Sequence, residues 1–270
     1  MNGSLPQPTL NALPLGAHSL YALTDEALFA ACGVRVAFTG REGGVSTGPY
    51  ASLNTAAHVQ DDLACVTRNR EIVAKALGAV EALWVIPNQV HGTNVVQIDE
   101  IADVPAAKKE AREGADAVLV RASGVGALLN FADCLPFVIV APDGSFVVGH
   151  AGWRGALAGI ARKAADALAA DGRDASGFNA YIGPHIHEEC FETSEEIASQ
   201  FSDEFGADVL ADKRHVSLAR VVTVDLMRAG MVENRIADAG ICTVCHSDRY
   251  FSYRASGGIC GRHAAAAIRT

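Results

Sequence analysis

"GALLNFADCLPFVIVAPDGSFVVGHAGWRGALAGIARKAADALAADG", residues 126–172, carries the densest run of strand and helix signals in the chain. Its apolar start predicts a strand that ends at Phe131, and a tight break follows at residues 132–134. A second strand is predicted from Phe137 to Val140. Pro142-Asp143-Gly144 has the residue types of a hairpin turn, so the following SFVVGH is expected to return as the partner of that strand.

The rest of the chain repeats this alternation of strands and helices. A helix is predicted after Gly155, with an apolar face formed by Leu157, Ile160, Ala164 and Leu168. Residues 62–77 form another helical pattern, and Thr193 with Glu196 has the form of a capping box for a further helix. More strands are predicted at residues 35–40, 94–98, 116–120 and 180–184. Strands in the centre with flanking helices predict an α/β (α+β) fold with a mixed sheet.

Length and composition limit the organisation of the chain and the classes of function. At 270 residues, half of them hydrophobic, the chain has enough apolar material for one large core. We therefore expect a single catalytic domain over residues 17–270, preceded by a flexible arm at residues 1–16, which are rich in Pro, Asn and Gly. A monomer or a small homo-oligomer is expected.

Charge and apolar runs argue against nucleic-acid and membrane partners. The net charge of −9 disfavours binding to a phosphate backbone, which usually needs a basic excess. The most apolar run, Leu135 to Val140, is far too short to cross a bilayer. No Lys or Arg precedes Arg35, so no secretory signal is predicted. With seven cysteines, this predicts a reducing, cytoplasmic location.

Three possible metal ligands lie at the ends of predicted strands: His91, Cys134 and His150. Each has a small or turn-forming neighbour, which leaves the side chain accessible. Two imidazoles and one thiolate make a three-ligand zinc set with a fourth position open for water. The same residues also have a structural explanation, because cysteine is commonly buried and a core histidine is usually only hydrogen-bonded. Spacing alone leaves both explanations open.

Five segments in order bear a family resemblance that extends from about Arg35 to the C-terminus. They are REGGVSTGPYASLNTAAHVQDD, NQVHGTNVV, ADCLPFVIVAPDGSFVVGHAGWRG, YIGPHI and FSYRASGGICGR. Together they resemble the polyphenol oxidase/laccase-domain family, whose members are also described as purine nucleoside phosphorylases. The resemblance implies a layered α/β/β/α sandwich. It also implies phosphorolysis of adenosine, inosine and methylthioadenosine, and deamination of adenosine, with a purine nucleoside and phosphate as partners.

The resemblance also implies that His91, Cys134 and His150 bind Zn²⁺ and form the catalytic centre. Zinc-assisted attack on adenine usually needs a carboxylate that moves protons, and Asp133 is the nearest candidate. The alternative role of Asp133 is that of a turn residue bonded to its own backbone.

Phosphate and nucleoside also need ligands. The candidates for phosphate are Arg41, Arg154, Arg254 and Arg262, because a guanidinium matches phosphate geometry. Asn54 and Gln89 are candidates for contacts to a base edge or a ribose hydroxyl, and Trp153 for a cavity wall. The alternatives are surface ion pairs for the arginines, loop capping for the amides and core packing for the tryptophan.

The sequence departs from the family pattern at two positions. His185 stands where relatives commonly have cysteine, and Ala255 stands where they have a second arginine. Alanine cannot supply the contacts of that second arginine, and Arg254 stands alone in this motif.

Three other functions remain open from sequence. Copper oxidation is one, because His₂Cys is also a blue-copper set, with Met227 or Met231 as a conceivable axial ligand. However, the chain has nine histidines and one His-x-His pair, which is too few for a multicopper cluster. A metal-free hydrolase with Cys134 as nucleophile is the second, and a nucleoside- or metal-binding module without turnover is the third.

The C-terminal segment holds Cys242, Cys245, Cys260 and His263 at a spacing that also suits structural zinc. The expectation is that these thiols pack in the core or face solvent. Arg254 and Arg262 are the expected functional residues of this segment.

Overall fold

The computed structural model describes residues 4–16, 20–79 and 83–270, whose strands form two sheets. Sheet A contains β1 (Asn11–Leu15), β2 (Leu20–Thr24), β3 (Val34–Thr39), β4 (Trp84–Val85), β7 (Gly126–Phe131) and β12 (His263–Arg269). Sheet B contains β5 (Val95–Ile98), β6 (Ala117–Val120), β8 (Leu135–Val140), β9 (Phe146–Ala151), β10 (Asn179–Ile182) and β11 (Ile236–Asp238). Their orders are β1-β2-β3-β12-β7-β4 and β11-β10-β8-β9-β6-β5. Both sheets are mixed, because β4–β7, β5–β6 and β10–β11 pair in parallel while the other pairs are antiparallel.

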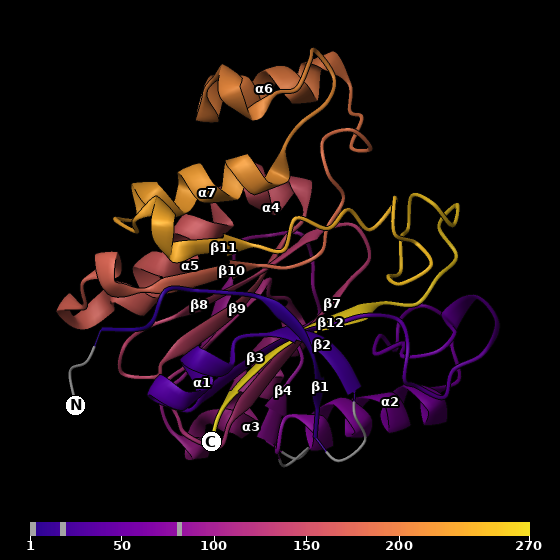
Figure 1. Cartoon of the computed structure of the whole chain (residues 1–270), viewed down its shortest axis with the longest axis vertical. Coiled ribbons are helices and arrows are strands. Elements are labelled where there is room, and N and C mark those ends of the chain that lie inside the picture. The colour runs from indigo at the N-terminus through magenta and orange to yellow at the C-terminus, as the bar shows by residue number, and fades with distance from the viewer. Residues whose placement is uncertain (1–3, 17–19, 80–82) are drawn as a thin grey trace.

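Seven helices flank the two sheets in the described part of the chain (Figure 1). They are α1 (Glu26–Cys32), α2 (Leu63–Ala76), α3 (Val104–Glu113), α4 (Trp153–Leu157), α5 (Ile160–Ala169), α6 (Glu195–Phe205) and α7 (Leu218–Arg228). Helices α4 and α5 pack on sheet B, α7 packs on these two helices, α6 packs on α4 and α7, and α2 packs on sheet A. The layers therefore follow the order α/β/β/α, and the predicted layered fold with mixed sheets is confirmed.

A large apolar cluster joins the two sheets to each other. Sheet A contributes residues such as Phe38 and Leu129, and sheet B contributes residues such as Val138 and Val148. All four are at most 1% exposed. Because each strand also buries its other face against helices, the central strands are apolar on both sides and show no polar alternation.

The segment that decides the fold joins the two layers. Strand β7 belongs to sheet A and β8 to sheet B, so residues 132–134 carry the chain from one sheet to the other. Asp133 adopts a left-handed backbone with φ 83° at this crossover. The predicted hairpin of β8 and β9 is present, and Gly149 in β9 lies under the ring of Phe137. A Cβ at position 149 would lie 2.1 Å from Cζ of Phe137, so only glycine is accommodated there.

Several predicted boundaries differ from the structure, three of them in the segments around the site. Strand β8 begins at Leu135, before Phe137. The helix expected after Gly155 is two helices, because Gly159 adopts a left-handed φ of 76° and separates α4 from α5. The N-cap of α6 is Ser194, whose side chain accepts a hydrogen bond from the N–H of Ile197.

The capping role expected of Thr193 is therefore wrong. Its hydroxyl donates instead to the carbonyls of Ser194 and Arg214.

The N-terminal arm expected at residues 1–16 also needs correction over its described part, residues 4–16. Residues 11–15 form β1, which pairs with β2 throughout its length. Leu5 is 4% exposed, and its carbonyl accepts a hydrogen bond from Arg235. The Pro- and Asn-rich composition suggested a loose segment, but apolar side chains between those residues tie it to the core. Residues 1–3 lie outside the described part of the chain.

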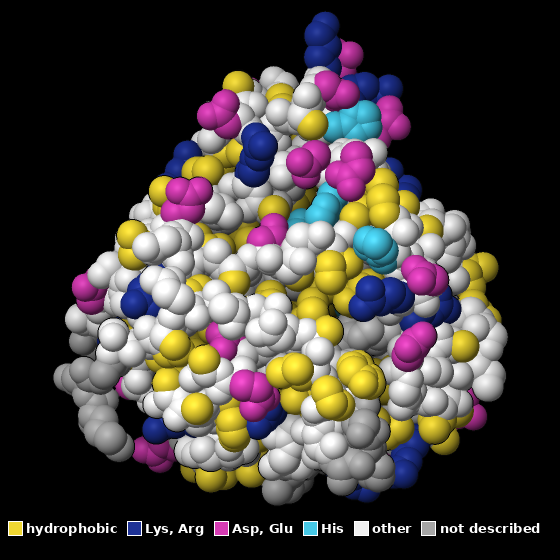
Figure 2. Space-filling view, viewed as in Figure 1, with side chains coloured by type: hydrophobic (Ala, Val, Ile, Leu, Met, Phe, Trp, Pro, Cys, Tyr) yellow, Lys and Arg dark blue, Asp and Glu magenta, His cyan; other side chains and the backbone are white. Residues whose placement is uncertain are grey.

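The surface carries both signs of charge. Basic and acidic side chains are interspersed over the face seen in Figure 2, and histidines lie in its upper half. Within the described ranges, no helix is long and apolar enough to cross a membrane.

Candidate active site

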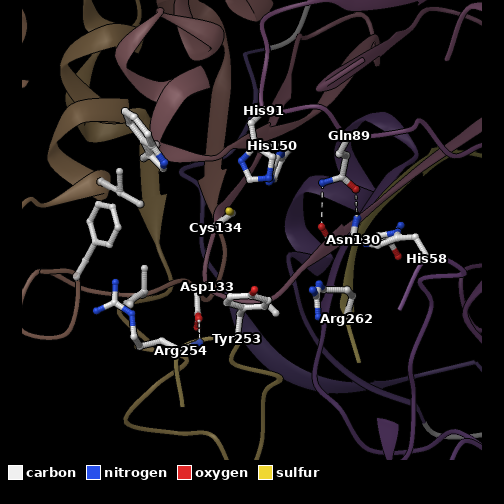
Figure 3. Close-up of a pocket in the computed structure, with 15 residues that line it drawn as sticks. His58, Gln89, His91, Asn130, Asp133, Cys134, His150, Tyr253, Arg254 and Arg262 are labelled. Carbon is white, nitrogen blue, oxygen red and sulfur yellow. Dashed lines mark hydrogen bonds between the residues drawn. The ribbon is translucent and has the colours of Figure 1, made fainter. Parts of the chain in front are cut away.

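The three candidate ligands come from different elements and meet at one point. His91 lies in the loop between β4 and β5, Cys134 ends the crossover between the sheets, and His150 lies in β9. Their ligand atoms all lie within 4.8 Å of one another. The two imidazoles meet edge to face, with ring centroids 4.9 Å apart (Figure 3).

Asp116, directly before β6, holds this arrangement in place. Its Oδ1 lies 2.7 Å from Nδ1 of His150 and accepts the backbone N–H of His91 at 3.0 Å. Its Oδ2 accepts the N–H groups of Gly92 at 2.6 Å and Val90 at 3.3 Å. The carboxylate is fully buried. It therefore fixes the loop that carries His91 and turns Nε2 of His150 away from itself, as the partner of a metal-binding histidine does.

The sequence reasoning did not identify Asp116. An aspartate directly before an apolar strand has the same appearance as an exposed strand-end residue, and no local pattern distinguishes the two.

The electrostatics favour a thiolate at Cys134. Burial would raise the pKa of this thiol, but the charge of His150 and hydrogen bonds with both imidazoles outweigh burial and lower the pKa to about 6. Burial would likewise lower the pKa of His150, but the Cys134 thiolate and the hydrogen bond to Asp116 raise it to about 9. Burial opposes ionisation of Asp116, yet its bonds to His150 and to the loop N–H groups leave its pKa lowered. The site thus stabilises the anionic sulfur that metal binding requires.

The donor set suits a metal, and the backbone beside it leaves room for the ligands. A Cβ at position 152 would lie 2.1 Å from Nδ1 of His91. Only glycine at this position therefore leaves room for the imidazole. The residues present therefore fit a Zn²⁺ ion held by two imidazoles and a thiolate.

Gly152→Ala is expected to displace the His91 ring and weaken metal binding by about 10- to 100-fold, the usual cost of disturbing a ligand's support. His91 is exposed, so its ring can move away while the fold persists. Competition with a chromophoric chelator measures the affinity, and circular dichroism checks the fold. Gly177→Ala is the matched control, because its nearest contact would be 3.7 Å away. Equal zinc affinity in the two variants would contradict this account of the site.

A cavity of about 420 Å³ opens above the three residues. Its walls are lined by His58, Gln89, His91, Asn130, Ala132, Asp133, Cys134, His150, Trp153, Ile186, Phe191, Leu218, Tyr253, Arg254 and Arg262. Apolar and aromatic side chains supply much of this lining, and a few polar groups converge on it. That combination is typical of a small-molecule site.

Four further predicted catalytic or binding residues line the cavity, and so does Trp153, the predicted wall residue. Gln89 pairs with the backbone of Asn130, donating from Nε2 at 2.9 Å and accepting at Oε1 at 2.7 Å. Asp133 accepts the hydroxyl of Thr243 at 2.6 Å and the N–H of Arg254 at 2.7 Å. The fourth, Arg262, lies across the cavity from the two imidazoles in Figure 3.

The other three predicted ligands lie outside the cavity lining. The guanidinium of Arg41 donates to the carbonyls of Ala51 and Ser247. Asn54 is fully buried and its amide organises its own loop, accepting the N–H of Arg262 at 2.9 Å.

Arg154 is exposed, with its guanidinium 4.3 Å from the ring of Trp153. Each of Arg41, Asn54 and Arg154 thus has a structural contact, and none of the three lines the cavity.

Several lining residues were not singled out from the sequence. His58 is one of them, and burial first, then the charges of Arg262 and Arg70, lower its pKa. Asn130, Tyr253 and Phe191 also line the cavity. They come from segments far apart in sequence, and nothing in their local patterns separates them from core or surface residues.

The four-residue zinc set considered at the C-terminus does not form. Cys260 packs in a small apolar cluster with Ala132 and Phe251, and His263 is buried in β12. Cys242 and Cys245 lie near Cys190 instead.

Comparison with known proteins adds to this geometry. Residues 35–270 match the family model described as multi-copper polyphenol oxidoreductase laccase. The chain is 30% identical over 235 residues to purine nucleoside phosphorylase YlmD of Bacillus subtilis (strain 168), covering 83% of this chain and 84% of that protein. It is 31% identical over 224 residues to adenosine deaminase RL5 of an unknown prokaryotic organism, covering 79% and 85%. The Bacillus licheniformis protein YfiH has the same fold, with a TM-score of 0.85 at 26% identity over 96% and 99% of the two chains. The chain thus belongs to the multi-copper polyphenol oxidoreductase laccase family.

Proposed function

We propose that this protein is a zinc-dependent purine nucleoside enzyme that catalyses phosphorolysis of adenosine, inosine and methylthioadenosine and deamination of adenosine. The convergence of His91, Cys134 and His150 on one wall of the cavity, opposite Arg262, carries this proposal. A cavity of about 420 Å³ suits a ligand of nucleoside size. Relatives named purine nucleoside phosphorylase and adenosine deaminase support it.

The three ligands would hold Zn²⁺ and leave a position that faces the cavity. Bound zinc supplies a Lewis acid and a water whose pKa is near neutrality. His150 is held in one orientation by Asp116, and the thiolate of Cys134 is already favoured. The protein therefore contributes a preorganised ligand set.

The opposite wall can hold an anion and a base. Within the described residues, Nε and Nη2 of Arg262 have no hydrogen-bond partner, because only Nη1 is bonded, to the carbonyls of Cys260 and Gly261 and to Sγ of Cys260. A free guanidinium edge suits phosphate. The rings of Trp153, Phe191 and Tyr253 line the same cavity and offer surfaces against which a purine can stack.

Deamination also needs a group that moves a proton to the leaving amine. Among the described residues of the cavity lining, Asp133 is the only carboxylate, and we assign this role to it. Its left-handed backbone and its bonds to Thr243 and Arg254 hold it beside Cys134.

A product assay with and without phosphate tests the proposed function. Zinc-loaded protein is expected to release adenine from adenosine only with phosphate, and inosine without it. Arg262→Gln is expected to lower phosphorolysis by about 10- to 100-fold with less effect on deamination, because it removes a charge-assisted phosphate contact. Products are separated by liquid chromatography. Nucleoside binding without any product, in protein of verified zinc content, would identify a binding module and refute the proposal.

A metal-free cysteine hydrolase is the second candidate, because one observation favours it. The lowered pKa of Cys134 beside the raised pKa of His150 is also typical of a nucleophilic cysteine paired with a base. Full activity in chelator-treated protein, together with an adduct trapped on Cys134, would establish this alternative.

Copper oxidation has less support from the geometry. Met227 is 45% exposed on α7 and Met231 is buried in the core, and neither lines the cavity. Stoichiometric copper in protein purified without added metal, together with oxygen consumption, would favour this function over ours.

A further inference from the structure

A second cluster of metal-ligating side chains lies among residues that the proposed reaction does not use. Cys190, Cys242, Cys245 and Glu189 each place one ligand atom within 4.8 Å of all the others. Sγ of Cys190 lies 3.6 Å from Sγ of Cys245. Ligands of a tetrahedral zinc ion, with Zn–S bonds of about 2.3 Å, place sulfurs about 3.8 Å apart. The spacing of these two thiols is therefore already close to that of a zinc site.

The backbone brings these residues together from two distant segments. Cys242 and Cys245 have the Cys-x-x-Cys spacing, and the N–H of His246 bonds the carbonyl of Cys242 at 3.0 Å, which closes a turn around both thiols. His185 pairs in parallel with Cys242, and this bridge aligns the segment that contains Cys190 with the turn. A third cysteine far away in sequence thus completes a set that the Cys-x-x-Cys pair begins.

We propose that Cys190, Cys242 and Cys245, with Glu189 as the fourth ligand, form a second Zn²⁺ site with a structural role. Three thiolates and a carboxylate give a closed tetrahedral set, as in structural sites, whereas the cavity site has three ligands and an open position. Cys242 is buried, while Cys245 and Glu189 are exposed, so an ion can reach the cluster from solvent. All seven cysteines are free thiols in the structure.

The site would fasten together a segment that lines the cavity and a segment that bonds to a lining residue. Phe191, directly after Cys190, lines the cavity, and the carbonyl of Cys190 accepts Nη1 of Arg254 at 2.9 Å. On the other segment, Thr243 lies between the two cysteines and bonds Asp133 at 2.6 Å. A metal at the cluster would therefore hold this wall of the cavity in place without contacting substrate.

Metal counting tests this site separately from the first. Full-length protein, purified under reducing conditions and equilibrated with Zn²⁺, is expected to hold two ions per chain by mass spectrometry of the metal content. Cys190→Ser and Cys245→Ser are each expected to hold one, and Cys65→Ser, in α2, is the control that retains two. Cys134→Ala, which removes a ligand of the cavity site, is also expected to hold one. The double variant Cys134→Ala/Cys245→Ser is expected to hold none.

Cobalt gives a second readout, because each thiolate adds sulfur-to-metal charge-transfer absorbance. Co²⁺-loaded Cys134→Ala is expected to keep about three-quarters of the wild-type intensity, since three of the four thiolates lie in the second cluster. Cys245 is exposed, so its substitution tests the site even if Cys190→Ser fails to fold. A single ion in the wild type that disappears with Cys134→Ala would overturn the proposal. So would a Cys190–Cys245 disulfide that persists in reductant and excludes the second ion.

Discussion

Cys134→Ala is expected to abolish turnover and remove the ion of the cavity site in the same protein. Cys134 is the one thiolate among three candidate ligands, and two imidazoles alone bind zinc too weakly to retain it at micromolar protein. Without the ion, the activated water is lost, and activity is expected to fall by at least about 1,000-fold. Metal content and the rate of product release, measured on one preparation, check both effects. His91→Ala is expected to behave in the same way.

The control for Cys134→Ala is Cys65→Ala, a half-buried cysteine in α2 outside the cavity lining. It is expected to keep both rate and metal. Retention of zinc and rate in Cys134→Ala would remove the site assignment. Loss of rate with the cavity zinc retained would instead make Cys134 a catalytic residue that is not needed to hold the metal.

Asp116→Asn is expected to have the second-largest effect, although Asp116 does not line the cavity. Both oxygens of the carboxylate face donors: His150 and the His91 N–H on one side, Val90 and Gly92 N–H groups on the other. An asparagine in the same place must direct its NH₂ group at one of these pairs. We expect a loss of about 3 kcal/mol in the free energy of unfolding and about 10- to 100-fold in zinc affinity.

Urea unfolding and chelator competition measure the two effects of Asp116→Asn separately. Asp143→Asn is the matched control, because the Asp143 carboxylate accepts the N–H of Ser145 and pairs with Arg173 in the β8–β9 turn, outside the cavity lining. It is expected to change stability while leaving zinc affinity unaltered. Equal zinc affinity in Asp116→Asn and wild type would show that the carboxylate is structural only.

The sequence predicted the fold and the site best where the residues that form a feature are neighbours in the chain. The hairpin of β8 and β9 follows from two apolar runs around Pro142-Asp143-Gly144, and it is present in register. The family motifs identified His91, Cys134 and His150, which the fold brings together. In both cases the informative residues are neighbours in the chain or belong to a motif.

The remaining features depend on contacts between distant segments, which single-sequence patterns do not encode. Consecutive strands β7 and β8 lie in different sheets, although their sequences resemble two strands of one sheet. Asp116 supports the site only because the loop that contains Gly92 and the strand that contains His150 both hydrogen-bond to its carboxylate. Cys190 lies beside Cys242 and Cys245, although about 50 residues separate it from them in the sequence. Cys260 and His263 are closer to this pair in the sequence but lie elsewhere in the core.

The strand orders also have a consequence for the folding pathway. Sheet B has a local hairpin at its centre, so β8 and β9 can pair early and carry Cys134 and His150 at their ends. Sheet A places β12 between β3 and β7, and this pairing must close very large loops before it gains any stabilisation. We therefore expect sheet A to form late. Until then the edges of β3 and β7 are unpaired, and the partly folded chain is most prone to aggregate.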